Sequence, residues 1–369
     1  MTSFMRKSIA MGVYSRNNVR QNFGLVFVDW PLTNTAYVRF WVDWSQLAPY
    51  PPDKDANGNN VYRNPVTDTR PVLPLSKGGT VAEYVRAIDN QIGFARGLGL
   101  KVVLTYYAFP PWANGVTYAD QYQRFPAADM SPTSPWAAYF LFCLLRWSSL
   151  NPFNGGAYAD FLEVCNEPNL YLRLPGDSTP LHVYGGRQMV TAQRLQRATG
   201  VRTPILVGPG TADNDTGSSA YRPFTKNLLS YLTSQSFTSD RYWAWSHHNY
   251  RDIRTETTGR AQNVRRELQD ANWKGWPRGD ATERYVLQTE GGALVNQIGE
   301  AEQARRVKAA YVRCQNDTAD RGEGLAMFSQ YLDITDPTGD FDSGMRRANL
   351  PFTPRPLYPT WAALPQPRR

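Results

Sequence analysis

The sequence predicts a single (β/α)8 barrel that spans residues 1–369, and three observations predict it. Short apolar segments alternate with amphipathic segments from one end of the chain to the other. Eight apolar segments can be counted, each followed by a helical or short helical stretch. The segments that enter the predicted strands are brief, whereas several that leave them are long. In a (β/α)8 barrel, the long segments all lie on the C-terminal face.

The predicted strands have the composition of strands that are buried on both faces. They are nearly continuous runs of β-branched and aromatic residues, without the strict alternation of a strand that has one wet face. The first unit is the least distinct, because "GLVFVDW", residues 24–30, also has a strand composition. The eight predicted strands are residues 9–15, 36–44, 100–108, 160–166, 204–210, 242–250, 284–292 and 324–332.

The clearest predicted helix covers residues 80–99. Thr80 and Glu83 have the spacing of a capping box, and the apolar residues that follow recur with a period near 3.6. Gly97 and Gly99 end the helix just before the third strand. The other predicted helices are residues 135–149, 186–200, 222–234, 258–272, 299–317 and 355–364.

Four of the predicted strands are followed by long loops, and loops of that length in a compact domain are usually functional. The chain holds 11 Trp and 21 Tyr, more than a core alone needs, and many of them fall in these loops. Some of these rings only pin the loops to the scaffold. At the mouth of the barrel we expect substrate contacts from Trp44, Tyr107, Trp112 and Tyr331. The four loops are residues 50–79, 108–134, 168–185 and 333–350.

Composition and motifs exclude several classes of protein. The three cysteines, Cys143, Cys165 and Cys314, are far apart and odd in number, which excludes a disulfide framework and a CxxC metal site. The sequence has no phosphate-binding glycine-rich loop, no GxSxG elbow and no HExxH motif. We therefore expect neither a metal ion nor an organic cofactor.

The net charge of +8 comes from scattered Lys and Arg residues, so we do not expect a nucleic-acid partner. The excess of positive charge makes an anionic, cell-envelope glycan one candidate substrate. No stretch approaches the roughly 20 apolar residues of a membrane span. The start of the sequence has no apolar signal-peptide region, so secreted and cytoplasmic locations both stay open. We expect a monomer.

Two carboxylates stand at the ends of predicted strands. Glu167 follows the fourth strand in an Asn-Glu-Pro triplet, and Glu290 ends the seventh strand in "LQTEGG". In a closed barrel the ends of different strands converge on one mouth. Two carboxyl groups that face each other across a sugar are the minimal apparatus of glycoside hydrolysis, one as proton donor and one as the attacking group. Their surroundings must push their pKa values apart.

The residues beside the two glutamates fit this division of roles. Asn166 can hydrogen-bond a sugar hydroxyl, and Pro168 keeps Glu167 out of the helical region. Gly291 and Gly292, directly after the second glutamate, allow the chain to approach a ligand closely.

Three further side chains are candidates for supporting the site. His248 and Tyr250 are two residues apart on the sixth predicted strand, so they point the same way. A hydrogen bond from the Tyr250 hydroxyl would hold the pKa of Glu290 low. Arg39, on the second strand, has the reach and the fixed charge to do the same. Arg39 can equally be a structural ion inside the barrel, and the two roles are compatible.

Plainer interpretations compete at several positions. A lone Asn-Glu-Pro is usually a solvated loop, and a single strand-end glutamate often bonds nearby backbone. His247 fits a core position better than a catalytic one, and His182 is isolated in a loop. Asp336, Asp340 and Asp342 resemble a loose calcium loop. Their spacing is not that of an EF-hand, so a solvated loop or a subsite wall is the better interpretation.

With these motifs the chain resembles the clan of retaining (β/α)8 glycoside hydrolases that carry catalytic glutamates after strands four and seven. Asn-Glu-Pro after "FLEVC" and Thr-Glu-Gly after "YVLQ" match the two hallmarks of that clan. "VRFWVDWSQLAP" and "VVLTYYAFPPWA" resemble glycoside hydrolase family 39 most, and family 5 next. The resemblance covers nearly the whole chain.

The resemblance implies that Glu167 is the acid/base and Glu290 the nucleophile of a retaining, double-displacement mechanism that needs no cofactor. The sequence departs from the clan at the eighth strand, "MFSQYLD", which lacks the tryptophan that often forms the floor of the sugar site. Gln330 and Tyr331 are the candidate substitutes. The residues for which the resemblance implies supporting or sugar-binding roles are Arg39, Asn166, His248 and Tyr250.

The predicted activity is hydrolysis of an oligo- or polysaccharide. The long, aromatic loops favour a cleft that holds several sugars, and hence endo action. Two alternatives stay open from the sequence. One is a carbohydrate-binding barrel without turnover, and the other is a transglycosidase that uses the same pair of glutamates.

Overall fold

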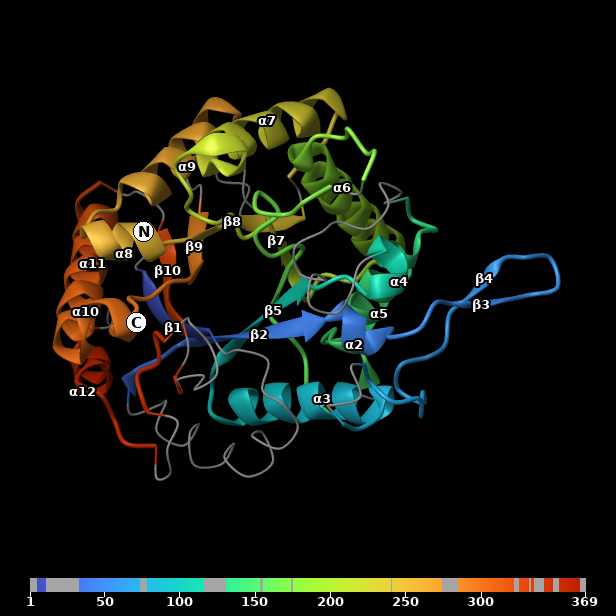
Figure 1. Ribbon diagram of the computed structural model, residues 1–369, viewed down its shortest axis with the longest axis horizontal. Coiled ribbons are helices and arrows are strands. Elements are labelled where there is room, and N and C mark those ends of the chain that lie inside the picture. Colours follow the sequence, from blue (N-terminus) through green and yellow to red (C-terminus); the bar gives the residue numbers. More distant parts are fainter. Residues whose placement is uncertain are drawn as a thin grey trace.

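Eight parallel strands close into a barrel (Figure 1), which confirms the predicted fold class. Around the barrel the order is β1-β10-β9-β8-β7-β6-β5-β2, and β2 pairs with β1 to close it. The computed structural model describes residues 5–10, 33–73, 78–115, 131–152, 155–173, 175–239, 241–273, 285–321, 325–331, 333–334, 342–347 and 352–365. The strands are β1 (Arg6–Ala10), β2 (Tyr37–Asp43), β5 (Lys101–Tyr107), β6 (Phe161–Glu163), β7 (Ile205–Val207), β8 (Tyr242–His248), β9 (Tyr285–Glu290) and β10 (Leu325–Tyr331).

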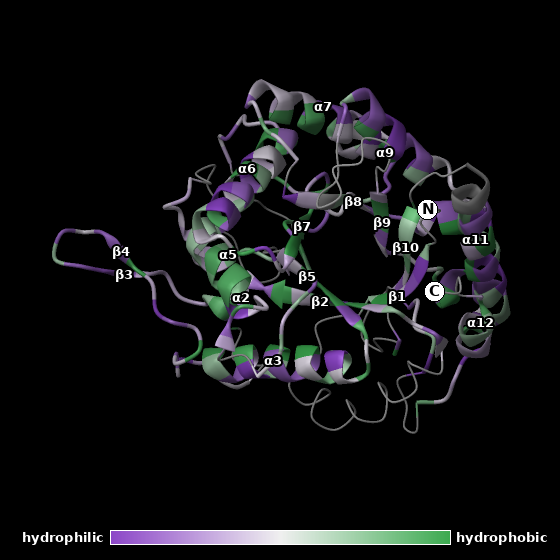
Figure 2. Ribbon diagram, turned by 180° about the vertical axis from the view of Figure 1, so that it is seen from behind, coloured by the Kyte–Doolittle hydropathy of each residue, from purple (hydrophilic) through white to green (hydrophobic). Residues whose placement is uncertain are grey.

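Helices surround the barrel (Figure 1), and the predicted capping box is present at the start of α3 (Val81–Gly97). The Thr80 hydroxyl accepts from the Glu83 amide at 3.3 Å, and the Glu83 carboxylate accepts from the Thr80 amide at 2.9 Å. Figure 2 shows apolar and polar residues alternating along this helix, as expected when one face packs on the barrel. The other helices are α2 (Trp44–Leu47), α4 (Pro111–Asn114), α5 (Pro135–Arg146), α6 (Leu181–Thr199), η5 (Gly217–Ser219), α7 (Tyr221–Ser234), α8 (Tyr250–Thr255), α9 (Gly259–Asp270), α10 (Val295–Ile298), α11 (Glu300–Arg321) and α12 (Leu357–Ala363).

None of the helices in the described ranges combines the length and the apolar character that a bilayer span requires.

The inside of the barrel is layered, because alternate residues of each strand point inward. On β2, Val38 and Phe40 point outward into the large apolar cluster beneath the helices, whereas Tyr37 points inward. Arg39 and Trp41 continue the inward set, each one step nearer the C-terminal mouth. The floor of the barrel is an apolar layer of Tyr37, Val103, Phe161, Val207, Ala244, Tyr285, Leu287, Ala326 and Met327.

A polar layer lies above the apolar floor. Arg39 is fully buried there, together with Thr105, Glu163, Ser246 and Thr289. The hydroxyl of Thr105 donates to Glu163 at 2.5 Å, Thr289 donates to the other oxygen of Glu163 at 3.3 Å, and the Ser246 and Thr289 hydroxyls are 2.5 Å apart. Because each member has partners in the layer, these polar groups can stay buried without a large desolvation penalty.

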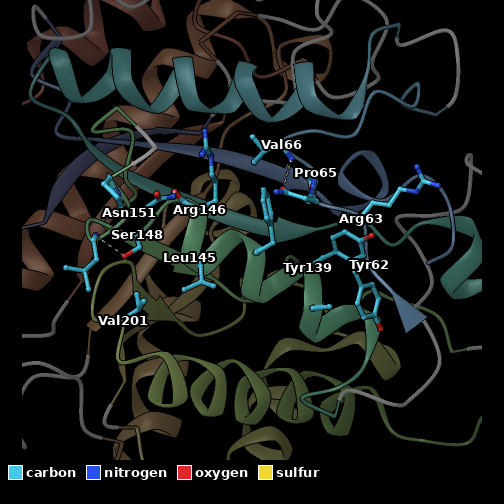
Figure 3. Close-up of a pocket in the computed structure, with 15 residues that line it drawn as sticks. Tyr62, Arg63, Pro65, Val66, Tyr139, Leu145, Arg146, Ser148, Asn151 and Val201 are labelled. Carbon is cyan, nitrogen blue, oxygen red and sulfur yellow. Dashed lines mark hydrogen bonds between the residues drawn. The ribbon is translucent and has the colours of Figure 1, made fainter. Parts of the chain in front are cut away.

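Two features lie on the outside of the barrel. The strands β3 (Asp53–Lys54) and β4 (Asn60–Val61) form a ribbon that projects away from the body (Figure 1). A groove of about 580 Å³ runs beside α5 (Figure 3), and none of its lining residues is a strand-end residue of the mouth. It is lined by Tyr62, Arg63, Asn64, Pro65, Val66, Ala138, Tyr139, Phe142, Leu145, Arg146, Ser148, Leu150, Asn151, Pro152 and Val201.

Candidate active site

Glu167 and Glu290 meet at the C-terminal mouth of the barrel. Glu290 is the last residue of β9, and Glu167 lies four residues beyond the end of β6. One carboxylate oxygen of each, and a ring nitrogen of His248, lie within 4.8 Å of one another. The imidazole stands between them, with Nδ1 2.8 Å from Glu167 Oε1 and Nε2 3.6 Å from Glu290 Oε2. The two carboxylates therefore face one small space.

Glu167 has an unusual backbone. The sequence predicts that Pro168 keeps it out of the helical region, and its φ of +45° places it in the left-handed region. That conformation costs a non-glycine residue about 1–2 kcal/mol, so neighbouring contacts must hold it. The Glu167 amide donates to the Gly210 carbonyl at 2.6 Å, and its own carbonyl accepts from the Leu170 amide at 2.9 Å. The strained residue is thus fixed on both sides.

Glu290 is held in its charged form. Arg39 Nη1 donates to its Oε2 at 2.7 Å, and the Tyr250 hydroxyl donates to its Oε1 at 2.5 Å. Burial alone would raise the pKa of Glu290, but the charges of His248 and Arg39 and the bond from Tyr250 outweigh burial and lower the pKa below the usual 4.5. An ionised carboxylate in a nearly dry setting suits a nucleophile.

Arg39 connects the polar layer to the mouth. Its Nη2 donates to Glu163 at 2.8 Å and to the Asn166 side-chain oxygen at 2.7 Å, and its Nε donates to Thr105 at 2.7 Å. Burial opposes its charge, but the two glutamates raise the pKa of Arg39 further above its ordinary value. Both roles left open by the sequence, structural ion and support of Glu290, are visible in these contacts.

Glu163 was missed by the sequence analysis. It is fully buried and forms an ion pair with Arg39, so the barrel holds three glutamates around one guanidinium and one imidazole. The available signal was a carboxylate inside an otherwise apolar strand, four residues before Glu167. A buried charge without a partner is rarely tolerated, so such a residue predicts an ion pair in the barrel.

His248 is buried, and burial opposes its charge. The charges of Glu290 and Glu167 outweigh that opposition and raise the pKa of the imidazole above its usual 6.5. His248, Glu167 and Glu290 are also donor types that bind a divalent metal ion. Two observations disfavour a metal at this position. Arg39 and Tyr250 already bond the two oxygens of Glu290, and His248 Nδ1 is already bonded to Glu167.

Four aromatic rings form a continuous arc around the mouth, here called the aromatic arc: Tyr107, Trp41, Tyr331 and Tyr250. Neighbouring ring centroids are 6.4, 5.7 and 6.1 Å apart along that order, with edge-to-face geometry. The Trp41 ring also lies over the Arg39 guanidinium at 4.5 Å. Trp41 was missed by the sequence analysis, although its two-residue spacing from Arg39 places it on the same side of β2.

The structure separates the two candidate substitutes for the missing tryptophan. Gln330 is fully buried, and its amide nitrogen donates to the backbone carbonyls of Ser343 at 2.7 Å and Tyr331 at 2.8 Å. Its role is to hold the chain after β10. Tyr331 is half-buried in the aromatic arc, and its amide donates to the Gly291 carbonyl at 2.6 Å, beside Glu290.

One predicted substrate contact is corrected. Trp44 is 1% exposed and packs beneath the helices against Phe109 and Tyr139, with centroids 5.8 and 6.2 Å away. Trp112 is half-buried, packs on the Trp44 ring at 5.8 Å and donates its indole N–H to the Ala48 carbonyl at 2.7 Å. These contacts pin the segment after β5 to the scaffold, and a substrate contact at Trp112 stays a prediction.

The role predicted for the glycines after Glu290 is also corrected. A Cβ on Gly291 would lie 1.7 Å from the Asn249 side chain, and one on Gly292 would lie 3.0 Å from Ser343. The absent side chains make room for protein neighbours rather than for a ligand. Gly210 has the same function beside the site, because a Cβ there would lie 2.3 Å from Glu163 Oε1.

The remaining candidates take structural positions. His247 is buried and bonded to the Thr211 hydroxyl at 2.9 Å, and burial lowers its pKa to about 3, as expected of a core residue. Asp342 is held by Arg355 through two hydrogen bonds of 2.5 and 2.8 Å. Asp336 and Asp340 lie outside the described residues.

No protein-family model and no curated protein matches this chain. Solved structures do match over nearly its whole length. One is a family 39 glycoside hydrolase from the gut symbiont Bacteroides cellulosilyticus WH2, with 16% identity and a TM-score of 0.55. That match covers 98% of this chain and 63% of the other, so this chain spans less than two thirds of that protein.

Two further solved structures are similar. A family 5, subfamily 18 enzyme from Streptomyces cattleya, solved with GlcNAc, has 13% identity and a TM-score of 0.56, covering 100% of this chain and 83% of that one. The family 53 glycoside hydrolase catalytic domain of Ignisphaera aggregans has 12% identity and a TM-score of 0.57, and the match covers 98% of this chain and 96% of that one. At these identities, the matches establish the shared barrel fold.

Replacing Tyr250 with phenylalanine should change both the pH dependence and the rate of catalysis. The variant loses a hydrogen bond to the Glu290 carboxylate, so the pKa of Glu290 rises and the acid limb of the kcat/KM profile moves to higher pH. At pH 7 Glu290 stays ionised, but the carboxylate is no longer oriented by the Tyr250 hydroxyl, so we expect kcat/KM to fall on the order of ten-fold. Tyr242→Phe, which removes a buried hydroxyl that donates to Met189 instead, should leave the limb in place. Equal movement of the limb in both variants would contradict this role.

Proposed function

We propose that the protein is a retaining glycoside hydrolase that cleaves an oligo- or polysaccharide by double displacement. The observation that carries the proposal is the pair of facing carboxylates, Glu167 and Glu290, of which one is held ionised by Arg39 and Tyr250. The shared fold with glycoside hydrolases of families 39, 5 and 53 supports the proposal.

Glu290 attacks the anomeric carbon while Glu167 gives a proton to the leaving oxygen, and a covalent glycosyl-enzyme forms. Glu167 then takes a proton from a water molecule, which attacks the same carbon and frees Glu290. Glu167 is the more exposed of the two, with 27% of its side chain accessible against 10% for Glu290. That difference suits an acid/base that exchanges protons with water.

The separation of the carboxylates supports retention of configuration. Retaining enzymes hold their two carboxyl groups roughly 5–5.5 Å apart, whereas inverting enzymes leave about 6.5–9.5 Å for an intervening water. One oxygen of Glu167 and one of Glu290 lie within 4.8 Å. This short spacing favours direct attack by a carboxylate over attack by an intervening water.

We assign to Asn166 the binding of a sugar hydroxyl next to the nucleophile. Arg39 Nη2 holds its side-chain oxygen at 2.7 Å, so the amide nitrogen of the same side chain is the group that can donate to a sugar. The long loops at the mouth favour a cleft for several sugars, and with it endo action.

The anomeric configuration of the first product tests the proposal. A glycan panel is digested, and the first-formed reducing ends on the cleaved member are followed by proton NMR before mutarotation. We expect the configuration of the substrate to be retained. Inverted product would contradict the double displacement. Tight binding of a glycan without any new reducing ends would favour a carbohydrate-binding barrel, and transfer to an added sugar in preference to water would favour a transglycosidase.

A further inference from the structure

We infer that the sugar ring bound next to Glu290 is uncharged, and that Trp41 and Tyr331 select for it. The inference rests on the proposed glycosidase function and names the class of substrate that its site accepts. It replaces the expectation, based on net charge, of an anionic glycan.

The cation nearest the nucleophile cannot reach a substrate. Arg39 is 0% exposed, and its donors are directed at Glu163, Glu290 and Asn166 at 2.7–2.8 Å. The ring of Trp41 covers the guanidinium at 4.5 Å. A carboxylate on the sugar would therefore meet the indole and not the positive charge beneath it.

The second cation of the site is equally committed. His248 is 0% exposed and lies between Glu167 and Glu290, at 2.8 and 3.6 Å. Among the described residues of the cluster, the two cationic side chains, Arg39 and His248, face three carboxylates, so no positive charge is left over for a substrate. A uronic acid would bring one more negative charge into this cluster without a partner, and an unpaired charge in a nearly dry site is costly.

The aromatic arc offers the opposite kind of surface. The faces of its rings carry partial negative charge, which repels a carboxylate and attracts the slightly positive C–H groups of a neutral sugar ring. Tyr331 is half-buried, whereas Trp41, which it contacts, is only 8% exposed. Its backbone bond to Gly291 fixes it beside the nucleophile. Trp41 meets Tyr331 edge to face and covers Arg39.

The net charge of +8 does not outweigh these contacts. Exposed charges are screened over about 10 Å at ordinary salt. The charge can attract an anionic polymer to the surface, but the groups that touch the ring decide which sugar is cleaved.

Matched substrates test the inference. For the glycan that the protein cleaves, a counterpart that differs only at C6 is prepared, by oxidation to the uronate or, if the cleaved glycan is acidic, by reduction to the neutral sugar. We expect kcat/KM for the neutral member to exceed that for the uronate by at least about 100-fold. The variant Tyr331→Arg places a cation in the aromatic arc. In it, the ratio of kcat/KM for the neutral substrate to kcat/KM for the uronate should fall at least about ten-fold. Leu150→Ser, in the outer groove, should leave the ratio unchanged.

The outcomes are distinguishable. Equal or faster cleavage of the uronate by the unaltered protein overturns the inference and leaves the glycosidase function standing. An unchanged ratio in a folded Tyr331→Arg variant overturns the role given to the aromatic arc. No cleavage of any glycan overturns the proposed function, and this inference with it.

Discussion

Replacing Glu290 with alanine is expected to lower kcat by at least about 10⁴-fold on any glycan that the protein cleaves. The variant has no group that can attack the anomeric carbon, and Arg39 and Tyr250 keep donors aimed at an empty position. A slow fluorosugar should label the unaltered protein on a peptide that contains Glu290 and on no other carboxylate. Measurement of kcat and mass spectrometry of the labelled digest check the two parts.

Chemical rescue sharpens this prediction. In Glu290→Ala, added azide can occupy the vacated space and attack the sugar, so it should restore turnover and give a glycosyl azide of inverted configuration. Glu302→Ala, which removes an exposed carboxylate on α11, should keep full activity. Full activity in Glu290→Ala, or label on another carboxylate, would exclude Glu290 as the nucleophile.

Replacing Arg39 with methionine is expected to lower the free energy of unfolding by about 3–5 kcal/mol and to abolish most activity. The variant leaves Glu163 buried and unpaired and removes the donor that holds Glu290. Without Arg39 the pKa of Glu290 rises, because burial is then opposed by fewer charges and hydrogen bonds. A carboxyl group whose pKa is higher in the folded than in the unfolded state destabilises the protein at neutral pH, but not below its unfolded pKa. The loss of stability in Arg39→Met should therefore shrink as the pH falls. Urea unfolding at several pH values measures this loss.

A second substitution separates charge from packing. Glu163→Gln in the Arg39→Met background removes the uncompensated charge, so stability should partly return while activity does not. Arg305→Met, which breaks exposed ion pairs with Glu256 and Glu302, should cost far less stability than Arg39→Met, because exposed pairs are screened by solvent. Equal losses for Arg39→Met and Arg305→Met would show that the buried network contributes nothing beyond a surface pair.

The fold could be predicted from the sequence because the same strand-helix unit recurs along the whole chain. Each unit pairs an apolar strand segment with an amphipathic helix, so one weak unit does not change the conclusion. The strand ends were predictable for the same reason, since all parallel strands of a closed barrel end at one mouth. Hence Glu167 and Glu290, far apart in the chain, could be placed together before their distance was known.

The packing around the site was harder to predict. Trp44 and Trp41 stand three residues apart in one aromatic-rich segment, yet one packs beneath the helices and the other faces the mouth. The alternation of β2 accounts for this difference, because Trp44 falls on the outward side with Val38 and Phe40, whereas Trp41 falls on the inward side. The function of Gly291 depends on Asn249, which belongs to a different strand end. Contacts of this kind depend on three-dimensional neighbours that no local pattern reports.

The left-handed backbone of Glu167 bears on which residue selection has kept at this position. Selection for folding alone would favour glycine there, because glycine adopts that conformation at no steric cost. A glutamate in its place means that the chain tolerates a less stable turn in order to keep a carboxylate at that point. The strained backbone at Glu167 therefore supports its proposed role, independently of any resemblance to other barrels.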